Sequence, residues 1–284
     1  MPTSGEFEYL SKDNYSQILA FSAAPFNGSS GAMAGFIISF WDLSNIRRME
    51  SDLKKSDRLA ALGELSARMA HEIRNPLAAM CGSVQLLAAH MAVDEDDGRL
   101  LAIVMREADR LNLLITEFLE YARPLSPVKQ RIELGSFFED IILFLSTDPR
   151  FSNISTTSTV SKFMSLYADP NQLRQVMINI LQNSADAMER GGKIEIESCY
   201  LLSGSDAFKK APVTRISITD SGTGISDETA RRLFEPFWTT KGEGSGLGLA
   251  ITYRIIEAHA GTISVETPEG GGCRFIINLP GQNQ

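Results

Sequence analysis

The first candidate for chemistry in this chain is His71, in the stretch His-Glu-Ile-Arg-Asn-Pro-Leu-Ala-Ala-Met over residues 71–80. Around it, apolar or small residues recur in steps of mostly three and four, the spacing of a helix that packs in a coiled coil or bundle. The stripe is Leu59, Leu62, Ser66, Met69, Ile73, Pro76, Met80 and Leu87. Because His71 is two positions from both Met69 and Ile73, it lies roughly 200° from each around the helix and faces solvent. An exposed imidazole can act as a nucleophile, although without a second signal it would simply be a solvated side chain.

Two asparagines, Asn179 and Asn183, could hold a metal ion. They are four residues apart in a helix that we predict from Pro170 to Glu189, so they share one helix face. Mg²⁺ prefers oxygen ligands and keeps several waters, and paired amides suit a hydrated Mg²⁺ beside phosphate oxygens. The alternative is a pair of solvated amides.

A carboxylate followed by glycines marks a second part of the same site. Asp220 comes directly after a predicted strand, and Gly222 and Gly224 follow it. A carboxylate at a strand end can accept a hydrogen bond from an exocyclic amine, which adenine offers. The glycines permit positive φ angles and a close approach to a base or ribose. The alternative is a tight turn with a capping aspartate.

The third part is a glycine-rich segment over residues 241–249, Lys-Gly-Glu-Gly-Ser-Gly-Leu-Gly-Leu, which opens another predicted helix. A helix N-terminus presents backbone N–H groups and the positive end of a dipole, both of which favour phosphate. The segment lacks the Walker pattern. It also differs from the Rossmann fingerprint, because one residue separates its last two glycines and no strand directly precedes them.

Together, the order and spacing of these three parts are similar to the ATP-binding fold shared by histidine kinases, gyrase-type ATPases, MutL and Hsp90. The His-Glu-Ile-Arg-Asn-Pro stretch resembles the phosphoacceptor box of two-component sensor histidine kinases, and the resemblance covers about residues 56–280. The Asn75-Pro76 variant of this box and the segment 118–124 resemble those of the nitrogen-regulation and type-IV-pilus sensor kinases. The resemblance implies autophosphorylation of a histidine from Mg-ATP and transfer to an aspartate of a response regulator.

The resemblance also implies a role for each residue. His71 would accept the phosphoryl group, and its ordinary pKa of ~6.5 leaves the ring mostly neutral near neutral pH. Glu72 would act as base or orienting carboxylate, and Asn75 would position water for dephosphorylation of the regulator. Asn183 would hold Mg²⁺ and Asp220 would contact adenine. The other residues implied to bind ATP are Asn179, Gly222, Gly224, Phe234, Lys241, Gly244, Gly246, Leu247 and Gly248, with residues 237–243 as a lid.

An α+β architecture should position these residues. We predict an antiparallel helical hairpin, with one helix ending near Met91, a polar turn over residues 92–98, and a second helix over residues 99–122. Its apolar stripes need a partner, so we expect a homodimer with a four-helix bundle. By resemblance, the C-terminal part is a two-layer α/β sandwich of the Bergerat (GHKL) type.

The strands and helices expected in the C-terminal part follow from alternating and helical patterns. The predicted strands are 161–167, 193–201, 213–219, 262–266 and 274–279, and the predicted helices are 136–146, 170–189, 227–234 and 247–260. Local signals support the helix ends: a capping box from Ser136 to Glu139, an Asp169 cap before Pro170, and Gly261 as a C-terminal cap.

The N-terminal part predicts two strands, residues 17–23 and 34–41, joined by a turn-rich segment from Pro25 to Gly31. Two strands cannot form a stable independent sheet. The segment 35–44 resembles the last strand and exit of a PAS sensor domain, and the alternative is a plain β-hairpin extension. The expected domains are a partial PAS-like segment (1–44), a helical connector (45–58), a dimerisation and phosphotransfer domain (59–124) and a catalytic ATP-binding domain (128–281).

Composition limits the remaining function classes. The net charge of −8 disfavours nucleic-acid binding. The three cysteines lack metal-type spacing, which indicates reduced thiols in the cytoplasm. No apolar run is long enough for a membrane span and no secretory leader is present, so we expect either a soluble protein or the cytosolic part of a longer membrane-anchored sensor.

Two other functions fit parts of this pattern: a gyrase- or MutL-type ATPase without phosphohistidine, and a dimeric scaffold that binds nucleotide without turnover. The stimulus, the partner regulator and the choice between phosphorylation in cis and in trans stay open.

Overall fold

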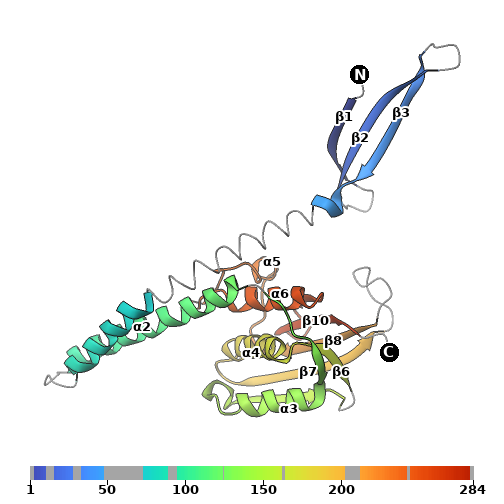
Figure 1. Ribbon diagram of the computed structural model, residues 1–284. Helices are drawn as coiled ribbons and strands as arrows, with labels where there is room; N and C mark the ends of the chain where they lie inside the picture. The colour runs from blue at the N-terminus through green and yellow to red at the C-terminus, as the bar shows by residue number, and fades with distance from the viewer. Residues whose placement is uncertain are drawn as a thin grey trace. The chain divides into compact units, whose positions relative to one another are not determined.

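The computed structural model describes residues 3–10, 16–27, 33–47, 73–88, 95–123, 125–161, 164–201, 212–241 and 244–281. They belong to two compact units, Met1–Leu65 and Ser66–Gln284. Figure 1 shows the helices and strands of both units.

The N-terminal unit is an antiparallel sheet in the order β1-β2-β3, followed by a helical turn at residues 44–47. Its strands are β1 (Thr3–Leu10), β2 (Ser16–Asn27) and β3 (Met33–Asp42). Two of the three were predicted. β1 was missed, although it pairs with β2 along its whole length and its Phe7 and Tyr9 alternate as a strand should. The turn predicted to start at Pro25 is wrong there, because Pro25 pairs with Phe36 inside the sheet.

The second unit begins with the predicted helical hairpin. A helix covers residues 73–88, and α2 (Glu95–Ala122) packs antiparallel beside it (Figure 1). Arg74 Nη2 donates a 2.7 Å hydrogen bond to Thr116 Oγ1 across the pair, and Leu77 and Ala108 are buried. The polar turn expected over residues 92–98 is wrong from Glu95 onward, because α2 begins there. Acidic side chains in a first turn are favoured by the helix dipole.

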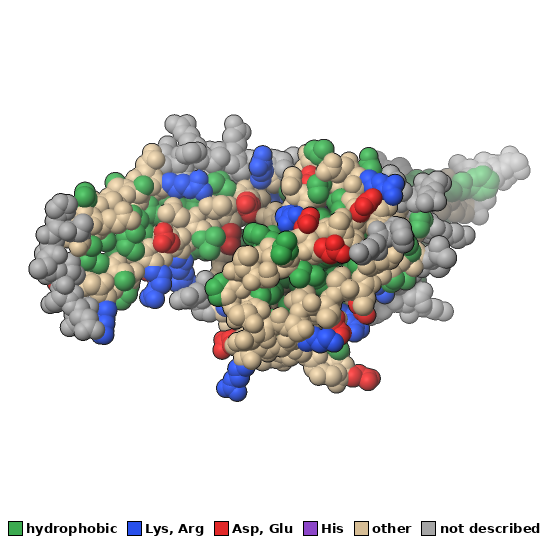
Figure 2. All heavy atoms as spheres, turned by 90° about the horizontal axis from the view of Figure 1, so that it is seen from below, with side chains coloured by type: hydrophobic (Ala, Val, Ile, Leu, Met, Phe, Trp, Pro, Cys, Tyr) green, Lys and Arg blue, Asp and Glu red, His purple; other side chains and the backbone are tan. Residues whose placement is uncertain are grey.

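Apolar residues of the hairpin remain exposed in the single chain. Ile73, Met80 and Leu87 recur at seven-residue intervals and are 45%, 55% and 51% exposed. On α2 the exposed apolar residues include Leu100, Ile103, Val104, Leu111 and Leu113. Figure 2 shows hydrophobic side chains gathered along this hairpin.

The rest of the unit has a five-stranded sheet in the order β5-β7-β8-β10-β9, in which only β5 and β7 are parallel neighbours among the pairs described. Its strands are β5 (Ile154–Thr159), β7 (Gly192–Leu201), β8 (Val213–Asp220), β9 (Thr262–Glu266) and β10 (Cys273–Pro280). A small sheet pairs β4 (Gln130–Glu133) with β6 (Ser165–Ala168).

Helices form the second layer. They are α3 (Leu134–Leu145), α4 (Pro170–Asp186), α5 (Asp227–Arg232) and α6 (Gly248–Ala258), with the 3₁₀ turn η1 (Pro149–Phe151). The largest fully buried side chains are Phe138, Leu134, Ile141, Leu173, Met177, Ile180, Leu181, Ile194, Ile196, Ile216, Ile218 and Leu247. They come from both layers, and the alternate residues of β8 and β10 point into the same core.

The start of α4 follows the predicted cap. Asp169 Oδ1 accepts hydrogen bonds from the N–H groups of Asn171 and Gln172, and Pro170 takes the first helical position. His259, at the end of α6, is buried, and its Nε2 accepts a 3.0 Å hydrogen bond from the Asp169 N–H while Nδ1 lies 2.8 Å from the Ile255 carbonyl oxygen. His259 therefore packs the end of α6 against the start of α4.

Two local predictions need correction, and two strands were missed. The capping box at Ser136 is wrong: α3 starts at Leu134, and Ser136 Oγ instead donates to the Glu133 carbonyl. Leu134 is fully buried and its N–H bonds the Met164 carbonyl, so tertiary contacts decide where this helix begins. The strand predicted over residues 161–167 is displaced to β6, and β4 and β5 were not predicted. β5 is a run of serine and threonine with a single aliphatic residue, so its pattern was weak.

The C-terminal cap of α6 also differs from the predicted one. The residue in the left-handed conformation is Ala260 (φ 58°), not Gly261. The N–H groups of Ala260 and Gly261 bond the carbonyls of Glu257 and Ile256, the two bonds of a Schellman motif. Gly261 is required for another reason, because a Cβ there would lie 2.7 Å from the Asn278 carbonyl oxygen.

Candidate nucleotide site

The two asparagines of α4 are four residues apart and share one face, as predicted, and Val176, Ile180 and Leu181 of the same helix are fully buried. Asn179 Nδ2 donates a 3.0 Å hydrogen bond to the Gly248 carbonyl and lies 3.4 Å from Thr252 Oγ1, so Asn179 joins α4 to the start of α6. Asn183 Nδ2 donates to the Asn179 carbonyl at 2.8 Å. That bond fixes the amide plane of Asn183 and directs its Oδ1 away from the helix.

Asp220 ends β8 and is 3% exposed. Its Oδ1 accepts hydrogen bonds from the N–H groups of Gly222 (2.9 Å) and Cys273 (3.1 Å), and its Oδ2 accepts one from Ser184 Oγ (2.9 Å). Ser184 follows Asn183, so this contact ties the carboxylate to α4. Burial, together with the Asp220 charge, raises the pKa of the Cys273 thiol to about 12, which keeps that thiol neutral.

The hydrogen bonds that Asp220 accepts leave its carboxylate able to accept one more, from an adenine amine. Among the described residues, Oδ2 accepts a single hydrogen bond, so one lone pair of a buried carboxylate remains for an exocyclic amine. A Cβ at Gly222 would lie 3.0 Å from both the Ala187 carbonyl oxygen and Asp220 Oδ1, so a side chain there would crowd the carboxylate.

Glycines on two separate turns meet beside Asp220. Gly224 has φ 72°, and a Cβ there would lie 3.0 Å from the Gly272 carbonyl oxygen. Gly272 has φ 79°, and its Cβ would overlap the Asp220 carbonyl oxygen. Sequence reasoning missed Gly272. The run of three glycines from Gly270 was the available signal, since it stands directly before β10.

The glycine-rich segment leads into α6 through a tight contact. Gly246 has φ 70°, its carbonyl accepts from the Phe237 N–H at 3.0 Å, and a Cβ there would lie 2.7 Å from the Trp238 carbonyl oxygen. α6 starts at Gly248 after Leu247, and no side chain in the described part of the chain caps it. The N–H groups of its first turn therefore have no partner within the helix and suit an anion.

Phe234, which precedes the expected lid, and Phe237, which begins it, differ in their surroundings. Phe234 is partly buried and packs on Tyr253 with ring centroids 5.7 Å apart, so its position is that of a core residue. Phe237 is 61% exposed, has φ 65°, and lies 6.4 Å from the ring of Phe118 on α2. A Cβ at Gly244 would lie 2.9 Å from Thr239 Oγ1, which also accepts from the Lys241 N–H.

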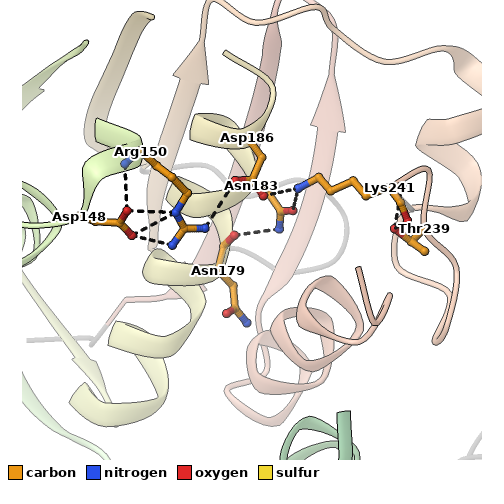
Figure 3. Close-up of polar contacts among 7 residues, drawn as sticks. All are labelled: Asp148, Arg150, Asn179, Asn183, Asp186, Thr239 and Lys241. Atoms are coloured by element: carbon orange, nitrogen blue, oxygen red, sulfur yellow. Dashed lines mark hydrogen bonds and ion pairs between the residues drawn. The ribbon is translucent and has the colours of Figure 1, made fainter. Parts of the chain in front are cut away.

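Lys241 reaches back to α4 (Figure 3). Its Nζ donates to Asn183 Oδ1 at 2.8 Å and to Asp186 Oδ2 at 2.6 Å. Asp186 also faces Arg150 of η1, which forms an ion pair with the N-cap residue Asp148. These last three residues were not predicted. A surface pocket of about 440 Å³ adjoins them.

The structure does not test the acceptor end of the site. His71 and Glu72 lie outside the described residues, as does His90. Asn75 lies in the helix over residues 73–88 and is exposed.

Two family models match this chain. Residues 61–127 match the His Kinase A (phospho-acceptor) domain, and residues 168–283 match the histidine kinase-, DNA gyrase B- and HSP90-like ATPase. Sporulation kinase E of Bacillus subtilis is 38% identical over 242 residues, which are 85% of this chain and 31% of that protein. The histidine-protein kinase AtoS of Escherichia coli is 35% identical over 263 residues, 92% of this chain and 42% of that protein.

The chain belongs to the sensor histidine kinases. This is the family that the sequence motifs indicated. The crystal structure of the histidine kinase ThkA in complex with the response regulator protein TrrA is similar to this chain, with a TM-score of 0.58 and 28% identity over 98% of this chain and 79% of that one. The α+β fold, with a helical hairpin and a C-terminal ATPase domain of the GHKL type, is confirmed.

The chain spans about a third to two fifths of the length of these two curated relatives. In the parts of the chain that the structure describes, we find no helix with the length and apolar character that a membrane span requires.

Proposed function

We propose that this chain is an ATP-dependent protein histidine kinase that phosphorylates His71 and passes the phosphoryl group to a response regulator. The observation that carries the proposal is the convergence at α4. Through Asn179 and Ser184, this helix is bonded both to the start of α6 and to Asp220. In this proposal the start of α6 binds phosphate and the Asp220 carboxylate binds the adenine amine, and the asparagine face of α4 lies between them.

In this proposal ATP is the substrate and Mg²⁺ is the cofactor. Asp220 accepts from the adenine amine, while Gly222 and Gly224 allow the base to approach. Asn183 Oδ1 is the protein ligand of Mg²⁺, which offsets phosphate charge and helps to align attack. The phosphates face the first turn of α6, after Gly246.

The chemical step falls to residues of the acceptor helix. An imidazole nitrogen of His71 forms the P–N bond as the bond from the γ-phosphorus to the bridging oxygen breaks, and ADP leaves. Glu72 orients the ring or takes its proton. Asn75 acts in dephosphorylation of the response regulator, where it positions the water that attacks the phosphorylated aspartate.

The exposed apolar stripe of the hairpin and a related crystal structure support two kinds of partner: a second copy of this chain and a response regulator. Ile73, Met80 and Leu87 form a half-exposed stripe at the seven-residue spacing of a helix seam, which supports a homodimer with a four-helix bundle. The response regulator bound in the related ThkA crystal supports a receiver-domain partner.

The domain boundaries in this proposal are residues 1–44, 45–58, 59–124 and 128–281. The three-stranded sheet with an exit at Asp42 supports a PAS-like sensor segment: the Ser44 N–H bonds Asp42 Oδ1, and Ser44 Oγ accepts from the Ile18 N–H. A cytoplasmic location agrees with three free thiols at Cys81, Cys199 and Cys273.

The test is autophosphorylation with γ-labelled ATP and Mg²⁺. We expect a label that is labile in acid and stable in base, and that disappears in His71→Gln while the variant still binds nucleotide. Nucleotide hydrolysis without any protein label would instead identify a gyrase- or MutL-type ATPase. Nucleotide binding with neither label nor hydrolysis would identify a scaffold.

A further inference from the structure

The ammonium of Lys241 stands between two oxygens of α4. It contacts Asn183 Oδ1 at 2.8 Å and Asp186 Oδ2 at 2.6 Å, so the two oxygens converge on one point (Figure 3). The shorter contact is the one to the carboxylate, a charge-assisted hydrogen bond. A single cation therefore already uses the amide oxygen that we assign to Mg²⁺.

Asp186 is itself held in place. Arg150 Nη1 lies 3.5 Å from Asp186 Oδ1, the oxygen that does not bind Lys241. The guanidinium is fixed from the other side, because its Nη2 and Nε bond the carboxylate of Asp148 at 2.6 and 3.1 Å. Asp148 also caps η1, where it accepts from the Arg150 N–H. The chain of contacts from η1 keeps Asp186 Oδ2 directed at Lys241.

We propose that Asp186 is a positioning residue of the nucleotide site, which holds Lys241 on Asn183 so that Lys241 and Mg²⁺ are alternatives at that amide oxygen. An ammonium and a divalent cation cannot both lie in contact with one oxygen, because their charges repel strongly. When the metal binds, Lys241 leaves α4 and its charge becomes available to a phosphate. This inference rests on the proposed function and adds a residue that the motifs do not include.

The consequence is a gain of affinity when Asp186 loses its charge. In Asp186→Asn the ammonium is held less firmly, so it competes less with Mg²⁺ and is free for phosphate. For partly exposed ion pairs such as this one (Lys241 41% and Asp186 33% exposed), we expect roughly two- to fivefold tighter binding of the Mg-nucleotide. The gain requires Lys241, so Asp186→Asn should have no effect in the Lys241→Met background.

The experiment is a double-mutant cycle on the full chain, with equilibrium binding of a fluorescent ATP analogue in excess Mg²⁺. The four proteins are wild type, Asp186→Asn, Lys241→Met and the double variant. Glu195→Gln is the matched control, since it breaks an exposed ion pair with Lys193 on β7 and should leave the dissociation constant unchanged. Thermal unfolding of each variant checks that it is folded.

Tighter binding by Asp186→Asn that disappears without Lys241 supports the proposal. Weaker binding by Asp186→Asn in both backgrounds would show that Asp186 contacts the metal-nucleotide or supports the fold. Equal binding by wild type and Asp186→Asn would show that Asp186 does not position Lys241. Either result overturns the inference while the kinase proposal stands. A wild-type protein that binds no Mg-nucleotide would refute both.

Discussion

Asn179 Nδ2 donates a 3.0 Å hydrogen bond to the carbonyl oxygen of Gly248, across 69 positions of sequence. This bond joins the middle of α4 to the first residue of α6, so the amide face and the start of α6 keep a fixed separation. Asn183, one turn later, has no such bond to another element among its described contacts. Its Nδ2 bonds within α4 and its Oδ1 faces Lys241.

This difference predicts distinct phenotypes for the two asparagines. Asn179→Ala leaves the Gly248 carbonyl without its amide donor, so it should lower the free energy of unfolding by about 1 kcal/mol as well as weaken nucleotide binding. Asn183→Ala should change unfolding little but abolish the Mg²⁺ dependence of nucleotide binding. Chemical denaturation and nucleotide titration with and without Mg²⁺ measure both effects. Equal destabilisation by the two substitutions would make Asn183 a structural residue.

Asp220→Asn should abolish autophosphorylation and weaken nucleotide binding at least about tenfold, the effect of leaving a buried polar contact unmade. An amide also sets an NH₂ group against one of the three donors that surround the carboxylate, which should cost about 1–3 kcal/mol of stability. The dimer should persist, because Asp220 lies in the ATPase domain. Size-exclusion chromatography with light scattering checks this, and a monomeric variant would contradict the assignment.

Gly246→Ala should destabilise the ATPase domain and reduce nucleotide affinity. The residue has φ 70°, which costs a side-chain-bearing residue about 1–2 kcal/mol, and the new Cβ would lie 2.7 Å from the Trp238 carbonyl oxygen. Gly270→Ala is the matched control, since a Cβ there meets nothing within 4 Å. Thermal unfolding of both variants separates the two cases. Similar losses for both would remove the structural argument for Gly246.

The stability of the protein should fall in mild acid because of His259. Burial lowers the pKa of this side chain below its ordinary value of 6.5, and although a hydrogen bond to Ile255 opposes the shift, the net direction is downward. Above pH 6.5 the ring is neutral in both folded and unfolded states. As the pH falls below 6.5 the unfolded state takes up the proton first, so stability decreases, by at most about 1.4 kcal/mol per pH unit for one proton, until the folded pKa is passed.

Denaturation curves from pH 7.5 to 5 measure this slope, and His259→Gln should flatten it, since an amide oxygen can still accept from the Asp169 N–H. If the slope of stability between pH 7.5 and 5 is unchanged in His259→Gln, a group other than His259 is responsible for it.

The carboxyl of Asp169 titrates in a separate, lower pH range. Burial raises its pKa, but backbone hydrogen bonds from Val128, Gln172 and Asn171 outweigh that effect and hold the pKa below 3.8. The stability that Asp169 contributes is therefore present above pH 3.8 and is lost below it.

The sequence by itself determined the parts whose cause is local. Asp169 before Pro170 starts α4 because a side-chain acceptor meets free N–H groups within three residues. Asn179 and Asn183 share a face because of the helical repeat. Gly224, one of the two glycines expected to permit positive φ, adopts φ 72° within its own turn. Such features depend on neighbours in the chain, so residue types and spacing were enough to predict them and to indicate the family.

Only the tertiary structure decided what depends on distant partners. Lys241 meets Asn183 across 58 positions, and Arg150 meets Asp186 across 36, so neither pair leaves a pattern in the sequence. Gly272 must be glycine because it passes against Asp220, and α3 begins at Leu134 because the Met164 carbonyl takes its N–H. Close packing and buried hydrogen bonds between remote segments fix these positions, and their geometry exists only once the sheet and helices have come together.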